Sequence, residues 1–176
     1  MSSISTTKRV HHLLDALIAD YPRRQAAAEK LIAQMGIEAD LAFERSEPMP
    51  FDVIPFLDGS DRPLSPMLAA RFAFAGQLRF GQDVWVTPSQ IKTLIQDRDL
   101  MANHVARRQH WDGSAPMQYR DAALSVFAYT EGVPEDLTYL VWPSGATEPE
   151  VWDYSGHQEH RSGNLAEFLQ YLLTRE

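Results

Sequence analysis

Hydrophobic positions near the N-terminus recur at helical spacing. The first stripe consists of Val10, Leu13, Leu14, Leu17, Ile18 and Tyr21. Spacing of three and four residues predicts a helix that begins at Thr6 or Thr7. Pro22 then interrupts the pattern, and a second helical stripe follows until Met35, where Gly36 provides a left-handed stop. We therefore predict two helices that form a hairpin within residues 1–36.

The middle of the chain is less regular. Prolines crowd residues 44–66, which predicts loops and short pieces of structure. Residues 66–75 favour a helix, although their aromatic alternation is also compatible with a strand. Residues 84–86 predict a short strand. A helix over 88–110 should follow, with Thr87 as its cap, Pro88 in its first turn and Gln90 completing a capping box.

The last third of the chain has the residue pattern of a β-sheet. Short β-type runs occupy residues 124–129, 137–142 and 150–154, and glycine-containing turns separate them. Such short connections predict an antiparallel meander. Asn164 and Glu167 then mark the start of an amphipathic closing helix. We predict one α+β domain over residues 1–176, with N-terminal helices, an antiparallel sheet in the C-terminal half and a closing C-terminal helix.

Composition narrows the function classes. The 176 residues include no cysteine, which excludes disulfides and thiolate chemistry and fits a reducing compartment, so we expect a cytoplasmic protein. No apolar run approaches the length of a membrane span. Residues 112–176 hold eleven acidic and three basic side chains, which accounts for the whole net charge of −8. This sign disfavours nucleic-acid binding.

Two explanations of this acidic third stay open. It can serve solubility, or it can attract a basic partner. For a partner, we predict a binding surface on the meander and its turns, with Trp152 as a possible aromatic anchor. The candidate residues are Glu131, Glu135, Asp136, Glu148, Glu150, Trp152 and Asp153.

Catalytic signatures are weak. The chain has no phosphate-binding loop and no nucleophile-elbow motif. Asp153, His157, Glu159 and His160 form the best acid–base or metal-binding candidate, but their spacing matches neither common zinc motif, and a solvated polar loop explains them more simply. We therefore predict no catalytic residue, no metal and no cofactor.

The C-terminal half resembles the SUKH superfamily. The resemblance is carried by Val126-Phe127-Ala128-Tyr129, Glu131-Gly132, Leu137-Thr138-Tyr139-Leu140-Val141, Glu150-Val151-Trp152-Asp153-Tyr154 and the leucine-rich closing helix. It covers residues 81–176, with an echo near 50–59. SUKH proteins are best known as bacterial immunity proteins that neutralise toxins. The resemblance implies a non-catalytic α+β fold and a cognate toxin as partner, often a nuclease or another basic enzyme.

Three hypotheses result. The first is an immunity-type module that binds and neutralises a basic toxin through its acidic surface. The second is a small hydrolase or metal-dependent enzyme that uses Asp153, His157 and His160. The third is a regulatory scaffold without a toxin partner. The sequence leaves the oligomeric state open.

Overall fold

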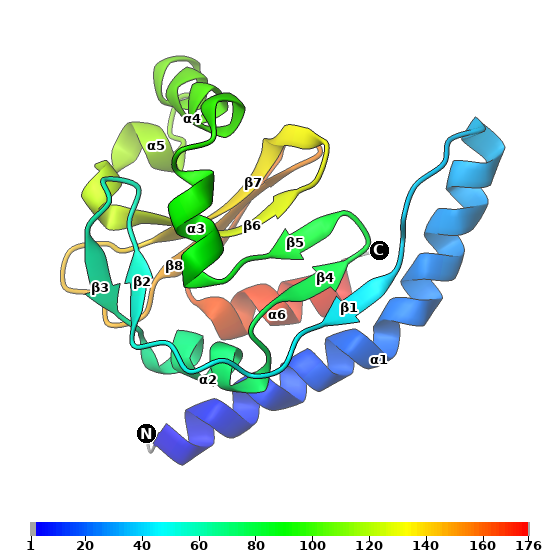
Figure 1. Cartoon of the computed structure of the whole chain (residues 1–176), viewed down its shortest axis with the longest axis horizontal. Helices are drawn as coiled ribbons and strands as arrows, with labels where there is room; N and C mark the ends of the chain where they lie inside the picture. The colour runs from blue at the N-terminus through cyan, green and yellow to red at the C-terminus, as the bar shows by residue number, and fades with distance from the viewer. Residues whose placement is uncertain (1–2, 176) are drawn as a thin grey trace.

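The computed structural model describes residues 3–175, and Figure 1 shows the arrangement of their elements. The helices are α1 (Ser3–Met35), α2 (Pro66–Phe74), α3 (Pro88–Leu94), α4 (Arg98–His110), α5 (Ala115–Gln118) and α6 (Leu165–Thr174), with a 3-10 turn at Asp121–Ala123. The strands are β1 (Phe43–Arg45), β2 (Val53–Pro55), β3 (Asp61–Pro63), β4 (Leu78–Phe80), β5 (Asp83–Trp85), β6 (Leu124–Thr130), β7 (Val133–Val141), β8 (Glu150–Ser155) and β9 (Gln158–Ser162). The predicted class, α+β in a single domain, is confirmed.

The N-terminal hairpin is a wrong prediction, because α1 is one continuous helix with Pro22 inside it. Proline costs the helix one backbone hydrogen bond. Side chains bridge the affected turn: Asp20 accepts hydrogen bonds from Arg23 at 2.8 Å and Arg24 at 2.6 Å. These arginines lower the pKa of Asp20 to about 2. Gly36 does end the helix, with a φ of 66°. The C-terminal part of α1 stands away from the body (Figure 1).

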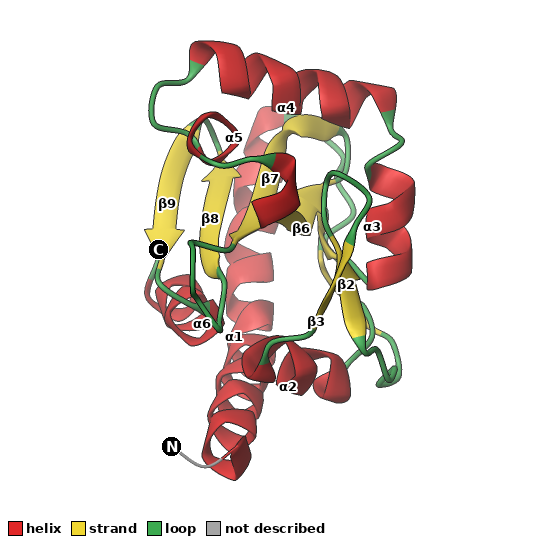
Figure 2. Cartoon of the chain, turned by 90° about the vertical axis from the view of Figure 1, so that its left-hand side faces the viewer, coloured by secondary structure: helices red, strands yellow, loops and turns green. Residues whose placement is uncertain are grey.

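One seven-stranded antiparallel sheet organises the molecule, in the order β1-β4-β5-β6-β7-β8-β9. The predicted three-strand meander, β6 to β8, therefore lies inside a wider sheet, between β5 and β9. Strands β2 and β3 form a separate hairpin. Helices α1, α2 and α6 pack together, and α6 also contacts β8 and β9, whereas α4 contacts β7. In Figure 2, α4 lies at the end of the molecule away from α2 and α6.

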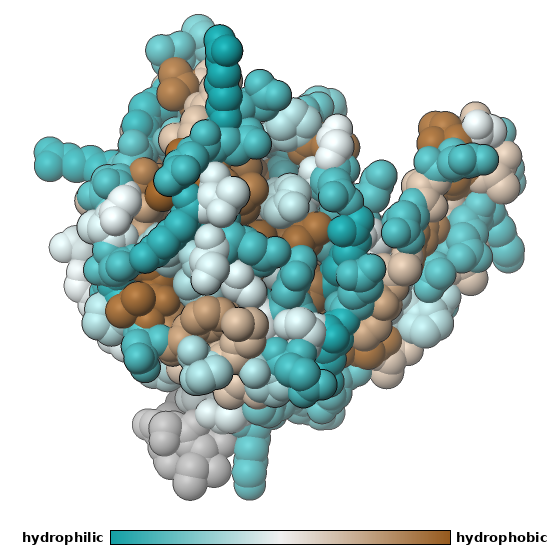
Figure 3. Space-filling view, viewed as in Figure 1, coloured by the Kyte–Doolittle hydropathy of each residue, from teal (hydrophilic) through white to brown (hydrophobic). Residues whose placement is uncertain are grey.

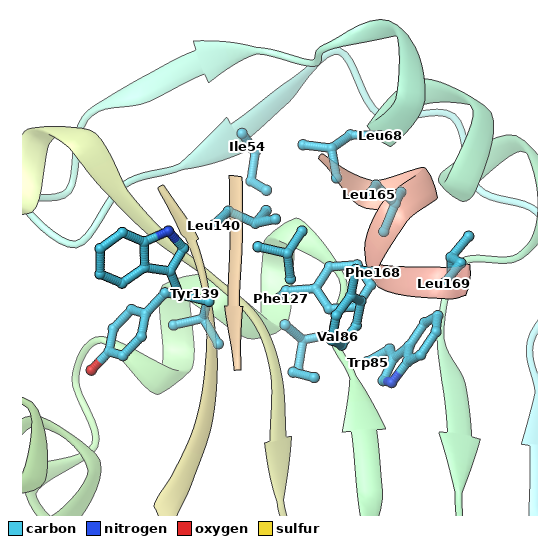
Figure 4. Packing of buried hydrophobic residues seen from close by; sticks show 14 of the residues in the cluster. Ile54, Leu68, Trp85, Val86, Phe127, Tyr139, Leu140, Leu165, Phe168 and Leu169 are labelled. Atoms are coloured by element: carbon cyan, nitrogen blue, oxygen red, sulfur yellow. The ribbon is translucent and has the colours of Figure 1, made fainter. Parts of the chain in front are cut away.

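The register of the sheet assigns side chains to its two faces. Trp85, Ala128, Thr138 and Asp153 are successive cross-strand partners, and paired residues share a face. Tyr139 points to the other face because side chains alternate along a strand. Figure 4 shows this division, with Tyr139 apart from the group around Phe127 and Phe168. The first face meets α1 and α6, and the second meets α4.

Local capping signals are confirmed at two helices. Thr87 and Gln90 form the predicted capping box of α3. The predicted helix over 88–110 nevertheless divides, since Asp97 accepts hydrogen bonds from the amides of Asp99 and Leu100 and thereby starts α4. Residues 66–74 form the favoured helix, α2. None of the helices formed by residues 3–175 is long and apolar enough to cross a membrane.

Asn164 caps α6 as predicted, and replacing it should cost stability. Its side-chain oxygen accepts from the Glu167 amide at 3.0 Å, while Glu167 accepts from the Gly163 amide at 2.9 Å. We expect Asn164→Ala to lower the free energy of unfolding by about 1 kcal/mol, because an amide at the helix start loses its partner. Urea unfolding followed by circular dichroism measures this. Asn164→Ser, which keeps an uncharged acceptor for that amide, should stay near wild type, and equal losses in both variants would contradict the assignment.

Candidate functional site

The predicted acidic residues divide between the two ends of the sheet. Glu131 lies in the β6–β7 turn, where it pairs with Arg79, and Glu135 and Asp136 lie at the start of β7. Asp136 accepts a hydrogen bond from the Gly156 amide of the β8–β9 turn at 3.2 Å. These residues form the acidic end of the sheet, a term we keep for Glu131, Glu135 and Asp136.

The other predicted acidic residues occupy the opposite end. Glu148 lies in the β7–β8 loop and accepts a hydrogen bond from the Met67 amide at 2.9 Å. Glu150 begins β8 and accepts from the indole nitrogen of Trp152 at 2.7 Å. Both carboxylates therefore satisfy donors within the fold. The predicted surface is not continuous.

Trp152 is 2% exposed, which contradicts its prediction as an exposed aromatic anchor. Its ring meets Tyr119 edge to face, and the Arg161 guanidinium lies 3.7 Å from the ring centroid. The predicted alternation of side chains along β8 is confirmed, because Glu150, Trp152 and Tyr154 share a face. However, the segment that follows α5 covers this face.

A cavity of about 320 Å³ lies between α1, α6 and the first face of the sheet. One part of its wall is aromatic and aliphatic, and the other part is polar. The apolar wall includes Leu17, Tyr21, Phe80, Trp85, Phe168 and Leu172. The polar wall includes Asp83, Thr130, Asp136, Thr138, Asp153 and Ser155. Such a combination of apolar surface with a few convergent polar groups is typical of ligand sites.

Asp153 belongs to this cavity. Its side chain is 8% exposed, and its two oxygens accept from the hydroxyls of Thr138 at 2.7 Å and Ser155 at 2.9 Å. The Arg175 guanidinium lies 3.7 Å away at the end of α6. Asp153 therefore faces a different environment from its neighbour Trp152, which lies on the opposite side of the same strand.

Asp83 is the residue that sequence reasoning missed. It begins β5, two positions before Trp85, and its carboxylate accepts from the Thr130 hydroxyl at 2.8 Å. Burial raises the pKa of Asp83, and the nearby charges of Asp153 and Asp136 add to the increase. The available signal in the sequence was a carboxylate two positions before Trp85, on the same side of the strand. Only the pairing of β5 with β6 places this carboxylate in a cavity.

The charges around the cavity are mostly negative. Asp83, Asp136 and Asp153 come from three different strands, and burial also raises the pKa of Asp136. Arg24 of α1 and Arg175 beyond α6 are the arginines in the cavity wall. One guanidinium nitrogen of Arg24, Nη2, is buried and lacks a hydrogen-bond partner within residues 3–175. The arrangement suits a ligand with a cationic end and a separate hydrogen-bond acceptor.

The residues of the enzyme hypothesis are only partly brought together. Asp153 and His160 are cross-strand partners on β8 and β9. His160 stacks on Tyr171 with ring centroids 3.4 Å apart, and burial lowers its pKa. His157 lies exposed in the turn with a left-handed φ of 61°. The predicted loop is thus a hairpin, whose register fixes the directions of these side chains. Residues 3–175 contain no group of three or more His, Cys, Asp or Glu placed to hold a metal ion.

A second polar cluster lies under α4, on the other face of the sheet. The imidazole of His104, 1% exposed, contacts the Tyr139 hydroxyl and Asp121, each at 3.0 Å. Burial raises the pKa of Tyr139 to about 12. Arg107 also donates to the Tyr139 hydroxyl at 3.3 Å. The residue types resemble an acid–base relay, but the buried contacts join α4 to β7, and we assign them a structural role.

Comparison of the chain with models of protein families, with curated proteins and with solved structures finds no match. The resemblance to the SUKH superfamily therefore stays a prediction. What the structure itself identifies is the acidic cavity and the carboxylates beside it.

Proposed function

We propose that this chain is a non-catalytic binding module of the immunity type, which acts in the cytoplasm by binding a basic toxin. The observation that carries the proposal is the acidic cavity, in which three aspartates from separate strands face an aromatic wall. Of the acidic end, Asp136 lines this cavity and Glu131 lies in the β6–β7 turn next to it, whereas Glu135 lines a depression on the α4 side with Arg107. Although Arg24 and Arg175 also line the cavity, the carboxylates there outnumber the guanidinium groups, and a surface of net negative charge steers a basic partner and raises the association rate.

This surface is narrower than the one that the sequence predicts. It keeps Glu131, Glu135, Asp136 and Asp153 and adds Asp83. It omits Trp152, Glu148 and Glu150, since these contact other parts of the fold. The same site also supports the less specific form of the proposal, a scaffold that binds a basic protein other than a toxin.

Charge reversal at the acidic end tests the proposal. We expect Glu135→Lys with Asp136→Lys to slow association with a cognate basic toxin by about tenfold or more at low salt, because the steering field is reversed. The difference should shrink as salt increases. The product of the adjacent gene is the first candidate toxin to test; surface plasmon resonance with it measures the rates, and survival of cells that express it measures neutralisation.

The matched control is Glu47→Lys with Asp52→Lys, at two exposed carboxylates before β2 and outside the cavity. It changes the net charge by the same amount and should leave association near the wild-type rate. If reversal at the acidic end has no more effect than this control, the surface is wrong. If binding to a basic non-toxin protein is lost while no toxin is neutralised, the scaffold function is supported instead.

A further inference from the structure

The cavity combines three features that one kind of ligand satisfies together. It has one buried and two partly exposed carboxylates, an apolar wall along its length and a partly exposed arginine with an unused buried donor. From these features we propose that the cavity receives a lysine side chain of the partner protein, with its ammonium group among the aspartates. This inference rests on the proposed function and names the chemistry by which the partner is recognised.

The carboxylates suit an ammonium group better than a guanidinium group. Asp83, Asp136 and Asp153 come from β5, β7 and β8 and line the cavity from one face of the sheet, so a small cation in the cavity can approach more than one of them. An ammonium ion is a compact charge with three donors, whereas a guanidinium group is a planar fork that prefers a bidentate carboxylate. A bound cation also offsets the burial that raises the pKa of Asp83.

The apolar wall suits the aliphatic stem of lysine. Phe80, Trp85 and Phe168 come from β4, β5 and α6 and line the cavity together with Leu17. Lysine buries its methylene groups on such surfaces while its charged end reaches polar groups. Aromatic ring faces additionally attract a cation. The ligand is therefore expected to need both the stem and the charge.

Arg24 marks where the partner backbone would lie. Its side chain is 22% exposed, compared with 8% for Asp153, so it lies nearer the surface. Its Nε donates to Asp20 at 2.6 Å, which holds the guanidinium in place, and its Nη2 is the buried donor without a partner. A buried donor without an acceptor costs stability. A peptide carbonyl of the inserted lysine residue would supply that acceptor.

The outer part of α1 suits apolar neighbours of this lysine. Tyr21 and Ala28 line the cavity, and Leu31 and Met35 continue the same side of the helix at helical spacing. Both are exposed, at 56% and 54%. Figure 3 shows a recess between this protruding part of α1 and the body of the molecule. The partner segment is accordingly expected to carry apolar residues beside the lysine.

The test uses the full chain and small probes of known chemistry. Isothermal titration calorimetry should detect binding of Nα-acetyl-lysine methylamide. The norleucine analogue, which has the stem without the ammonium group, should bind at least tenfold more weakly. Asp83→Asn should weaken the lysine probe about tenfold or more, whereas Asp52→Asn should leave it unchanged. Arg24→Met should weaken the lysine probe about fivefold but leave n-butylamine unaffected, because n-butylamine has no carbonyl.

Loss of the fold cannot imitate these results. The pKa of Asp83 is raised in the folded state above the ordinary aspartate value of 3.8, so its contribution to stability is present below that pH and lost as pH rises. Asparagine at this position carries no charge, so the cost of burying the ionised carboxylate disappears. The Asp83→Asn variant should therefore be at least as stable as wild type at pH 7. Thermal unfolding at pH 7 checks this.

The outcomes separate the inference from the proposed function. If the norleucine analogue binds as well as the lysine probe, or if Asp83→Asn changes neither probe nor toxin binding, the lysine site is overturned. The proposed function then still stands if reversal at the acidic end weakens the toxin. If the probe binds through Asp83 but no basic protein does, the partner lysine and the proposed function both fail, and a free alkylammonium ion is the ligand.

Discussion

Arg71→Met is expected to lower the free energy of unfolding by about 3 kcal/mol. Arg71 lies on α2, is 0% exposed, and has no carboxylate paired with it within residues 3–175. Its guanidinium donates to the carbonyls of Ala75, of Gly76 at 2.8 Å and of Trp85 at 3.2 Å. It thereby satisfies the end of α2 and joins that helix to β5.

Two opposing effects decide the size of this loss. Burial lowers the pKa of Arg71 to about 9, so the folded state carries a cost for keeping the charge. Methionine has a similar size and removes that cost, but it takes the side-chain donor away from the carbonyls of Ala75 and Gly76, and each orphaned buried group costs roughly 1–3 kcal/mol. The lost hydrogen bonds therefore outweigh the relieved charge.

Urea unfolding followed by circular dichroism measures the effect. Arg98→Met removes an exposed arginine at the start of α4 and should change stability by less than about 0.5 kcal/mol. An Arg71→Met variant as stable as this control would show that the carbonyls of Ala75 and Gly76 do not depend on the guanidinium.

His104→Ala should be similarly damaging, with a loss of roughly 2–4 kcal/mol at pH 7.5. The change empties a buried volume and removes the imidazole from the Tyr139 hydroxyl and from Asp121. Arg107 and Arg108 still contact these two groups, which limits the loss. Urea unfolding at pH 7.5 measures it, and an unchanged midpoint would contradict the structural role of the cluster.

The same histidine should make stability depend on pH. Burial lowers the pKa of His104 below the ordinary histidine value of 6.5, and Arg108 and Arg107 act in the same direction, while Asp121 opposes them. The unfolded chain therefore binds the proton more readily than the folded chain. The contribution of His104 is present above pH 6.5 and is lost as pH falls from there through the lowered folded pKa.

Wild type should accordingly lose stability as pH falls below 6.5, and His104→Ala should lose less over the same interval. Burial also lowers the pKa of His160. His160→Asn in the wild-type background therefore separates the contributions of the two histidines to the pH dependence. If His104→Ala and wild type show the same pH dependence, the imidazole is not held neutral by its surroundings.

Signals between residues close together in the sequence determined where the capped helices begin and which side chains of a strand share a face. Thr87, Gln90, Asn164 and Glu167 cap their helices as predicted, because a cap depends on donors and acceptors only a few residues apart. The alternation of β8 was equally predictable, since it follows from the pleat of the strand. The acidic character of the C-terminal third also follows from the sequence alone.

Tertiary structure decided the rest, because the deciding contacts join distant residues. Pro22 remains inside a helix where Asp20 bridges the turn and α2 and α6 pack against α1. Trp152 is buried because a segment more than thirty positions earlier, around Tyr119, covers it. Asp83 meets Asp136 and Asp153 only through the pairing of β5, β6, β7 and β8. The sequence alone thus determined the charge, the capped starts of two helices and the three meander strands, whereas packing between distant elements selected which carboxylates share a cavity.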